Sequence, residues 1–454
     1  MLQQLRVENF KSWRTFDVDF RPITLLYGAN SSGKSSILQF LLMLKQTKDS
    51  NDNQAIVDLS GSYVELGSYR DAVYAHEENR SIKWSLEWSL TDSLSVPDPA
   101  RPNTELARDD KIQVDVELNM RSKQVNITSL SYEFGGSSFY IYKKQGRSKY
   151  QLDSLGNDDF RFIRSLGRAW DLPPPTRGYS FPDQAQTYFK NAQFLRLFET
   201  NYVEQIDKIF YLGPLRENPR RQYTWSGSNP SDVGPKGERA IEAILAARAR
   251  DESRNVKRKS RLKTFQEIVA WWLKELGLIH SFEVREVSEG SNLYRVFVRK
   301  SAKSPEALIT DVGFGVSQIL PVIALLYYAP VGSTVLIEQP EIHLHPAVQA
   351  GLADLFISVA HTRKIQLVVE SHSEHLLTRL MRRVAECDTP YGEIQPSDLA
   401  VYFCQNRQGT SSLEKLRVNL YGAIDNWPKD FFGDQMGEVF AREQAAINRR
   451  MNKR

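Results

Sequence analysis

A glycine-rich octapeptide near the amino terminus offers the clearest chemistry in this sequence. Residues 28–35 read GANSSGKS and match the phosphate-loop pattern G-x-x-x-x-G-K-[ST] in full. Its glycines let backbone N–H groups turn inward toward a phosphate, and a following helix adds the positive end of its dipole. We expect Lys34 to reach the β- and γ-phosphates and the Ser35 hydroxyl to hold Mg²⁺. The residues predicted to bind nucleotide here are Gly28, Asn30, Ser31, Ser32, Gly33, Lys34, Ser35 and Ser36.

Acidic residues follow a short apolar segment far along the chain. The segment TVLI precedes Glu338, Gln339 and Glu341. A phosphate loop needs a second strand whose end presents a carboxylate to the metal, and Glu338 has this place. We therefore predict that Ser35 and Glu338 hold Mg²⁺. Glu341 has an alternative interpretation as an acid in the first turn of a helix, where negative charge is favourable.

Two further segments carry groups suited to phosphate. DVGFGVSQ precedes a long apolar run, so its amides and the Ser317 hydroxyl could form an anion-binding nest at a helix N-terminus. Gly315 and Gln318 are the other candidates in this segment, which also fits a plain loop and N-cap. A strand-like LVVE leads into His372, which places an imidazole at a strand end.

The elements that must hold these groups are predicted from hydrophobic periodicity. A buried strand is expected at 23–27, before the phosphate loop, and a leucine-rich helix after it. From about 293 to 404, predicted strands and helices alternate, which indicates an α/β fold with a mostly parallel sheet and helices on both faces. Between about 80 and 145 a period of two predicts an antiparallel meander, and a helix is expected around 184–206.

Composition excludes several classes of protein. The 454 residues are 41% hydrophobic and 25% charged, as in folded globular proteins, and a net charge of +4 is too small to predict a nucleic-acid binder by itself. Two cysteines, Cys387 and Cys404, cannot build a disulfide framework, so we expect a reducing, cytoplasmic location. The longest apolar run, 319–330, is shorter than the ~20 residues that cross a bilayer, and no membrane segment is expected.

The order of these motifs resembles that of a known ATPase group. Phosphate loop, glycine-rich segment, acidic strand end, HLHP at 343–346 and strand-end histidine follow one another as in the ABC-type ATPases of the RecF, SMC and overcoming-lysogenization-defect group. The resemblance covers residues 1–80 and 290–405, while YLGPLRE at 211–217 and NWPKDFF at 426–432 look like a prokaryotic subfamily. It implies an ABC-type P-loop core in two parts, with an antiparallel β subdomain and an α-helical arm inserted between them.

The resemblance also implies boundaries for these parts. The expected divisions are 1–90 and 291–425 for the two parts of the core, 91–205 for an antiparallel β and helical insertion, 206–290 for a helical, basic arm, and 426–454 for a tail.

What the group does implies a function for this chain. In the group, ATP and Mg²⁺ bind between two copies, and the glycine-rich segment with Ser317 completes the site of a second subunit. Glu338 stands at the position of the Mg²⁺ carboxylate, and His372 at that of the histidine that contacts the γ-phosphate. We therefore expect a homodimer or higher homo-oligomer. Such ATPases commonly occur in anti-phage or mobile-element operons, so we expect an ATP-dependent sensor or switch that controls a separate effector protein, a nuclease or toxin.

Gln339 departs from the group's pattern. It stands where the group has the glutamate that polarises the attacking water, and an amide cannot take up a proton. It can still orient water, as glutamine does in some GTPases. We therefore predict slow ATP hydrolysis. The predicted catalytic residues are Glu338, Gln339, Glu341 and His372.

Two other functions remain open. A nucleotide-stabilised scaffold with little turnover, which sequesters a toxic partner, is compatible with Gln339. A RecF-like DNA-repair ATPase would use the basic segment 248–263, RARDESRNVKRKSRLK, to contact nucleic acid. A solvated helix face explains that segment equally well.

Overall fold

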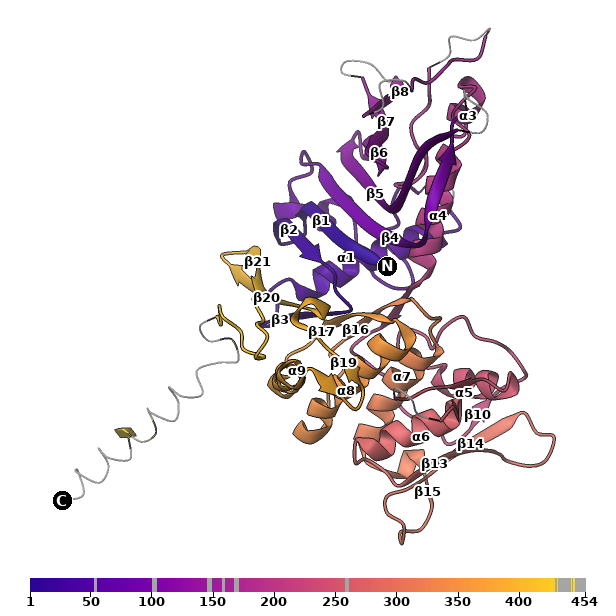
Figure 1. Cartoon of the computed structure of the whole chain (residues 1–454), viewed down its shortest axis with the longest axis vertical. Coiled ribbons are helices and arrows are strands. Elements are labelled where there is room, and N and C mark those ends of the chain that lie inside the picture. The colour runs from indigo at the N-terminus through magenta and orange to yellow at the C-terminus, as the bar shows by residue number, and fades with distance from the viewer. Residues whose placement is uncertain are drawn as a thin grey trace.

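A mixed sheet runs through the molecule and holds both predicted parts of the core. The computed structural model describes residues 1–52, 55–99, 104–144, 149–156, 160–166, 171–257, 261–428, 431, 442, 444 and 445. Thirteen strands of this described part form one sheet in the order β8-β7-β6-β5-β4-β1-β2-β21-β20-β3-β17-β16-β9 (Figure 1).

The five strands at one end of this sheet, β20-β3-β17-β16-β9, are all parallel. Three of them are buried along their whole length, which explains the unbroken apolar runs that predict them. Because parallel strands point the same way, the residues after their carboxyl ends meet at one edge of the sheet. The predicted α/β fold is confirmed. The bounds are β3 Ile23–Gly28, β9 Ile209–Leu212, β16 Thr334–Glu338, β17 Gln366–Glu370 and β20 Leu399–Arg407.

Antiparallel strands extend the same sheet instead of forming a separate one. β21 pairs with β20 and touches β2 through one parallel bridge, Trp13 with Ser411. From β2 to β8 all neighbours are antiparallel. The boundary expected between 90 and 91 falls inside β4. The bounds are β1 Leu2–Phe10, β2 Trp13–Asp19, β4 Ile82–Pro97, β5 Glu105–Arg121, β6 Gln124–Phe134, β7 Ser137–Lys143, β8 Tyr150–Leu155 and β21 Thr410–Leu416.

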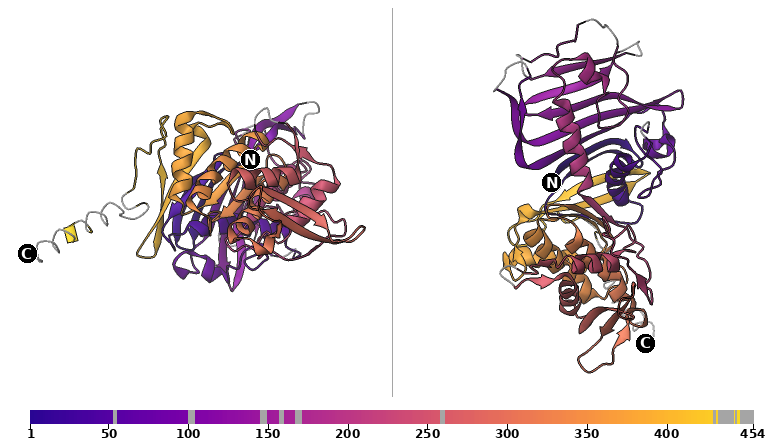
Figure 2. Two further views of the ribbon diagram at one scale, coloured as in Figure 1. Left: turned by 90° about the horizontal axis from the view of Figure 1, so that it is seen from below. Right: turned by 90° about the vertical axis from the view of Figure 1, so that its right-hand side faces the viewer.

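Helices cover both faces of the sheet, and side chains alternate between two hydrophobic clusters. α1 and α4 bury their apolar faces in the cluster that contains Leu336 and Val368, and α4 lies across the antiparallel strands (Figure 2, right). α7, α8 and α9 belong to the cluster with Ile337 and Val369 on the other face. The bounds are α1 Lys34–Asp49, α4 Leu195–Asp207, α7 Phe314–Tyr328, α8 Pro346–Arg363 and α9 Glu374–Glu386.

Short elements complete the chain. The one helix expected around 184–206 is two helices, α3 Gln184–Tyr188 and α4. No helix among the described residues is long and apolar enough to cross a membrane. The remaining short elements outside the arm are α2 Tyr69–Ala72, η1 Tyr74–His76, η2 Ile309–Asp311, η3 Pro396–Asp398, β18 Asp388–Thr389 and β19 Gly392–Glu393.

The interval expected as a helical arm, 206–290, is only partly helical. Helices α5 and α6 pack against α7, and a small antiparallel sheet in the order β10-β14-β13, with β15 beside β14, lies next to them. β13 and β14 form a hairpin that spans the boundary expected at 290, so this boundary does not separate two structural units. The bounds are α5 Ala240–Ala249, α6 Phe265–Glu275, β10 Tyr223–Thr224, β11 Ser253–Arg254, β12 Lys263–Thr264, β13 Ser281–Glu286, β14 Leu293–Arg299 and β15 Ala307–Leu308.

The basic segment 248–263 is folded where it is described. Arg250 and Arg254 both form ion pairs with Glu252, and Lys257 lies over the Trp271 ring. Residues 258–260, and all of the basic tail 446–454, lie outside the described residues.

Candidate active site

The phosphate loop connects strand β3 to helix α1, and two glycines shape it. Gly28 has a φ of 143°, and a Cβ there would lie 2.2 Å from the carbonyl oxygen of Cys404 on β20. Gly33, with a φ of 99°, is the N-cap of α1. Its carbonyl accepts a hydrogen bond of 3.1 Å from Nε1 of Trp13 on β2. Both positions therefore exclude a side chain, and neighbouring strands fix the loop from outside.

Lys34 is the first residue of α1 and folds back over the loop. Its Nζ donates to the carbonyl oxygens of Gly28 and Ala29, at 3.0 and 2.9 Å, and lies 3.8 Å from Oε1 of Glu370. Burial lowers the pKa of Lys34, and the charge of Glu370 partly offsets this. The ammonium group is thus held mainly by two neutral carbonyls, which a phosphate oxygen can replace with a stronger, charged acceptor.

Glu370, at the end of β17, accepts the hydrogen bond of the phosphate-loop serine. Ser35 Oγ donates to its Oε2 at 2.8 Å. The parallel register pairs Glu338 with Glu370. Leu336 and Val368, two residues earlier, both belong to the cluster on the α1 face. Because side chains alternate along a strand, the two carboxylates lie side by side on that same face.

Sequence reasoning missed Glu370. It ends a predicted strand just as Glu338 does, so the signal was present in the sequence. What the sequence does not contain is the strand order, which places β17 directly beside β3 and puts β16 one strand further away. Of the two acids, Glu370 is therefore the one next to the phosphate loop.

Glu338 is held by the chain that follows β9 rather than by Ser35. Tyr211 donates its hydroxyl to Oε1 of Glu338 at 2.7 Å, and Nη2 of Arg216 donates to the backbone carbonyl of Glu338 at 3.1 Å. Burial raises the pKa of Glu338 to about 7, and the neighbouring Glu370 adds to the rise. Neither Tyr211 nor Arg216 was predicted as a site residue, because their contact with Glu338 depends on the pairing of β9 with β16.

Glu341 and His372 meet beyond the ends of β16 and β17. Oε1 of Glu341 accepts a hydrogen bond of 2.5 Å from the backbone N–H of His372. Burial raises the pKa of Glu341, whereas burial and the charge of Lys34 lower the pKa of the His372 imidazole. Because α8 begins at Pro346, the alternative interpretation of Glu341 as a first-turn acid is wrong.

Gln339 begins the turn after β16 in a strained backbone conformation. Its φ is 45°, and its N–H donates to the carbonyl oxygen of Glu370 at 2.8 Å. A positive φ is uncommon for residues other than glycine, and such strain is concentrated at functional sites. The main chain of this turn is therefore fastened to β17.

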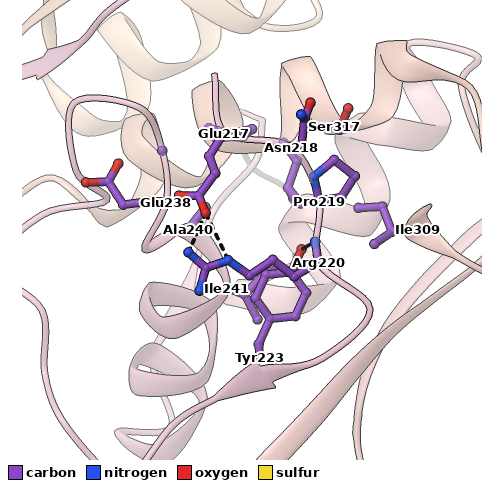
Figure 3. A pocket seen from close by; sticks show the side chains of 13 residues that line it. Glu217, Asn218, Pro219, Arg220, Tyr223, Glu238, Ala240, Ile241, Ile309 and Ser317 are labelled. Carbon is purple, nitrogen blue, oxygen red and sulfur yellow. Dashed lines mark hydrogen bonds and ion pairs between the residues drawn. The ribbon is translucent and has the colours of Figure 1, made fainter. Parts of the chain in front are cut away.

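The glycine-rich segment leads into the first turn of α7, and its Ser317 hydroxyl is bound within that turn. Ser317 is buried, and its Oγ donates to the carbonyl oxygen of Phe314 at 2.7 Å. In the described part of the chain, no hydrogen bond or ion pair joins Gly315 or the side chains of Ser317 and Gln318 to residues 28–36. Figure 3 shows Ser317 in a pocket that it lines together with Glu217, Pro219, Tyr223 and Ile309.

Most of the chain matches the model of one protein family. Residues 23–378 match the family described as "AAA domain, putative AbiEii toxin, Type IV TA system". The chain belongs to this AAA family. It is thus an AAA-type ATPase, in agreement with the phosphate loop described above. A shorter segment of this AAA ATPase, 394–441, matches "Protein of unknown function (DUF3696)", and no curated protein matches the chain.

Solved structures of SMC head domains are distantly similar to this AAA ATPase. A structure described as the SmcHead bound to the C-winged helix domain of ScpA has a TM-score of 0.44 at 14% identity, covering 92% of this chain and 98% of that one. The SMC head domain from Thermotoga maritima has a TM-score of 0.40 at 11% identity, with coverages of 91% and 98%. An Smc head domain from Pyrococcus furiosus has 0.40 at 12%, with coverages of 92% and 96%.

The residues of this AAA ATPase fit Mg²⁺ as a companion of ATP. The Ser35 hydroxyl and the carboxylates of Glu338 and Glu370 are hard oxygen donors, which Mg²⁺ prefers. The described residues contain no group of three or more His, Cys, Asp or Glu side chains arranged to hold a metal by themselves. Mg²⁺ commonly takes one or two carboxylates together with phosphate oxygens and water. Oγ of Ser32 and Oε2 of Glu341 are buried without partners among the described residues, so polar capacity remains for a ligand.

Proposed function

We propose that the protein is an ATP-dependent switch whose complete nucleotide sites form between two copies of the chain. One observation carries the proposal. Lys34, Ser35 and two strand-end carboxylates gather at one edge of the sheet, whereas no hydrogen bond or ion pair among the described residues joins Ser317 to them. A second copy would supply the N-terminus of its α7, which favours anions. Phe314, 54% exposed at the start of α7, suits such an interface.

Each residue of the proposed site has a definite task in binding. Lys34 exchanges the carbonyls of Gly28 and Ala29 for the β- and γ-phosphates. Ser35 would hold Mg²⁺ together with Glu338 and Glu370, and the bound ion would neutralise phosphate charge. With a pKa of about 7, Glu338 is partly protonated near neutral pH and must ionise to receive a cation. Mg²⁺-dependent binding should therefore strengthen as pH rises through 7.

Hydrolysis is proposed to be slow. The Gln339 amide can orient a water molecule but cannot take up its proton. Glu341 is engaged with the backbone of His372 and acts through the position of that histidine. The ATP-bound assembly would then be long-lived, which suits a switch that must stay in one state.

We further propose that this switch controls a separate effector, a nuclease or toxin, in prokaryotic anti-phage defence. The family description, which names a putative toxin of a type IV toxin–antitoxin system, supports this context. ATP would act through its different affinity for open and closed assemblies. A cytoplasmic location fits the two cysteines, Cys387 and Cys404, both of which are free thiols.

The proposal is tested by comparing the wild type with Lys34→Ala and Gln339→Glu. Analytical ultracentrifugation with and without Mg²⁺-ATP measures assembly, and phosphate release measures turnover. We expect ATP-dependent assembly and slow phosphate release in the wild type, and faster release in Gln339→Glu. Lys34→Ala should show neither ATP-dependent assembly nor phosphate release. An oligomeric state that changes neither with ATP nor in Lys34→Ala would contradict the switch. Fast phosphate release by the wild type that Gln339→Glu does not change would contradict slow hydrolysis.

The scaffold function remains a second candidate because of Gln339. A scaffold needs nucleotide binding but is indifferent to turnover, so Gln339→Glu would leave its capture of a toxic partner unchanged. The DNA-repair alternative has less support, since Arg250 and Arg254 of the basic segment are already paired with Glu252. A DNA-binding titration at two salt concentrations tests it, because phosphate contacts weaken steeply with salt.

A further inference from the structure

The segment that follows β9 brings a second cation to the edge of the sheet that holds Lys34. β9 is parallel to β16, so the chain after Leu212 leaves the sheet beside Glu338. Nη2 of Arg216 donates to the carbonyl oxygen of Glu338 at 3.1 Å. This is the same edge at which Ser35 and Lys34 contact Glu370.

The rest of the Arg216 guanidinium is unused. Its Nε and Nη1 are both buried and have no hydrogen-bond partner among the described residues. No carboxylate in the described part of the chain lies within 4.0 Å of it. A guanidinium carries five N–H donors in a rigid fork, and buried donors without acceptors are unfavourable. The fold nevertheless keeps this cation at the strand ends.

The charges around Arg216 connect it to the phosphate loop. Burial lowers the pKa of Arg216, and Tyr211, Glu338 and Glu341 partly offset this. Glu341 also acts to raise the pKa of Lys34, which burial lowers. The two cations lie at the ends of two strands that pair with each other, Lys34 beside Glu370 on β17 and Arg216 beside Glu338 on β16. Anions that enter between them would meet both.

We propose that Arg216 binds the terminal phosphate of the nucleotide and makes the site discriminate a nucleoside triphosphate from a diphosphate. This inference rests on the proposed ATP site. The unused N–H groups of Nε and Nη1 can donate the charge-assisted hydrogen bonds that phosphate oxygens accept. Because Arg216 also holds the end of β16, a bound terminal phosphate would be sensed at Glu338 and Gln339 directly.

Equilibrium titration in the presence of Mg²⁺ tests the proposal with a non-hydrolysable ATP analogue and with ADP as the two probes. Arg216→Ala should weaken binding of the triphosphate by about tenfold to hundredfold, the fold-change of a lost charge-assisted hydrogen bond, and leave ADP affinity within about twofold. Arg216→Lys keeps the charge but not the planar guanidinium, so its affinity for the triphosphate should lie between those of the wild type and Arg216→Ala. An unchanged ratio of the two affinities in Arg216→Ala would overturn the proposal.

A matched control separates this role from a structural one. Arg363 is also a buried arginine whose Nη2 donates to a carbonyl, that of Ala329, and whose Nε has no partner among the described residues. It lies at the end of α8, before β17 begins, and so at the opposite edge of the sheet. Arg363→Ala should lower the unfolding temperature as Arg216→Ala does, with the ratio of affinities unchanged. If both variants change the ratio equally, Arg216 is structural only.

The experiment distinguishes an error about the role of Arg216 from an error about the proposed ATP site itself. Lys34→Ala should abolish binding of both the triphosphate and ADP, because both nucleotides occupy the phosphate loop. If Lys34→Ala binds both as the wild type does, the proposed site itself is wrong. If Lys34→Ala loses both while Arg216→Ala keeps the wild-type ratio, only the role of Arg216 is wrong. Should Arg216→Ala not fold, Arg216→Lys gives the decisive ratio.

Discussion

Glu338→Gln should stabilise the nucleotide-free protein while it removes Mg²⁺-dependent ATP binding. The glutamine keeps an oxygen that can accept the hydrogen bond that Tyr211 donates at 2.7 Å, but it carries no charge. Burial raises the pKa of Glu338 from its ordinary value of 4.5 to about 7. The carboxyl group therefore binds its proton more tightly in the folded than in the unfolded state, and wild-type stability falls as pH rises between these values.

The size of the effect follows from the pKa values. Between pH 5 and pH 8, linkage gives a loss of about 2.5 kcal/mol in wild-type stability from this one group, at about 1.36 kcal/mol for each pH unit by which the pKa values differ. Glu338→Gln does not lose this stability, because the glutamine amide does not titrate in this range. Its advantage in the free energy of unfolding should therefore grow by about 2.5 kcal/mol over the same range.

Urea denaturation at the two pH values, followed by tryptophan fluorescence, measures this advantage, and calorimetric titration with ATP measures binding with and without Mg²⁺. Glu199→Gln is the matched control. Burial raises the pKa of Glu199 to about 7 as well, and its Oε1 accepts a hydrogen bond of 2.8 Å from the N–H of Phe181, away from the phosphate loop. It should gain stability in the same way and bind Mg²⁺-ATP normally.

Two results would each refute one part of this prediction, either the effect of burial on Glu338 or its role as a ligand of Mg²⁺. If the advantage of Glu338→Gln does not grow with pH, burial does not penalise this carboxylate. If Glu338→Gln binds Mg²⁺-ATP as tightly as the wild type, Glu338 is not a ligand of the ion, and Glu370 must serve alone.

Three further substitutions test the geometry of the site. Ser35→Ala should lower Mg²⁺-dependent ATP affinity by about tenfold or more while Mg²⁺-free affinity changes little, which titration with and without the ion would show. Gly28→Ala should lower the melting temperature by several degrees and abolish nucleotide binding, because its Cβ would lie 2.2 Å from the Cys404 carbonyl; wild-type melting and binding would contradict this. Tyr211→Phe removes a hydrogen bond that lowers the pKa of Glu338, so the pH midpoint of Mg²⁺-ATP binding should move upward, and an unmoved or lower midpoint would count against it.

The apolar pattern within each segment was sufficient to predict the strands that hold the candidate site. The apolar segment TVLI before Glu338 and the strand-like LVVE before His372 lie within β16 and β17 of the structure. Both are buried in the middle of a sheet, where an unbroken apolar run is the dominant signal. The phosphate loop is equally local, since its conformation depends on glycines within eight residues of one another.

The small sheet of the arm was harder to predict, because one of its strands depends on a distant partner. β10 at Tyr223–Thr224 pairs with β14 some seventy residues later, and neither β10 nor β13 has a strong pattern of its own. Pairing energy is gained only when the two segments meet, so a single sequence window does not contain it.

The sequence by itself determined which groups are present: a phosphate loop, acids and a histidine at strand ends, and an amide where a catalytic acid is expected. Tertiary structure alone decided which of them touch. The strand order puts Glu370, rather than Glu338, against Ser35, and the pairing of β9 with β16 brings Tyr211 and Arg216 to Glu338. The reason is physical: a side chain's chemistry is carried by its own residue, but its neighbours depend on strand pairings, and the pairings of β9 with β16 and of β3 with β17 join segments more than a hundred residues apart.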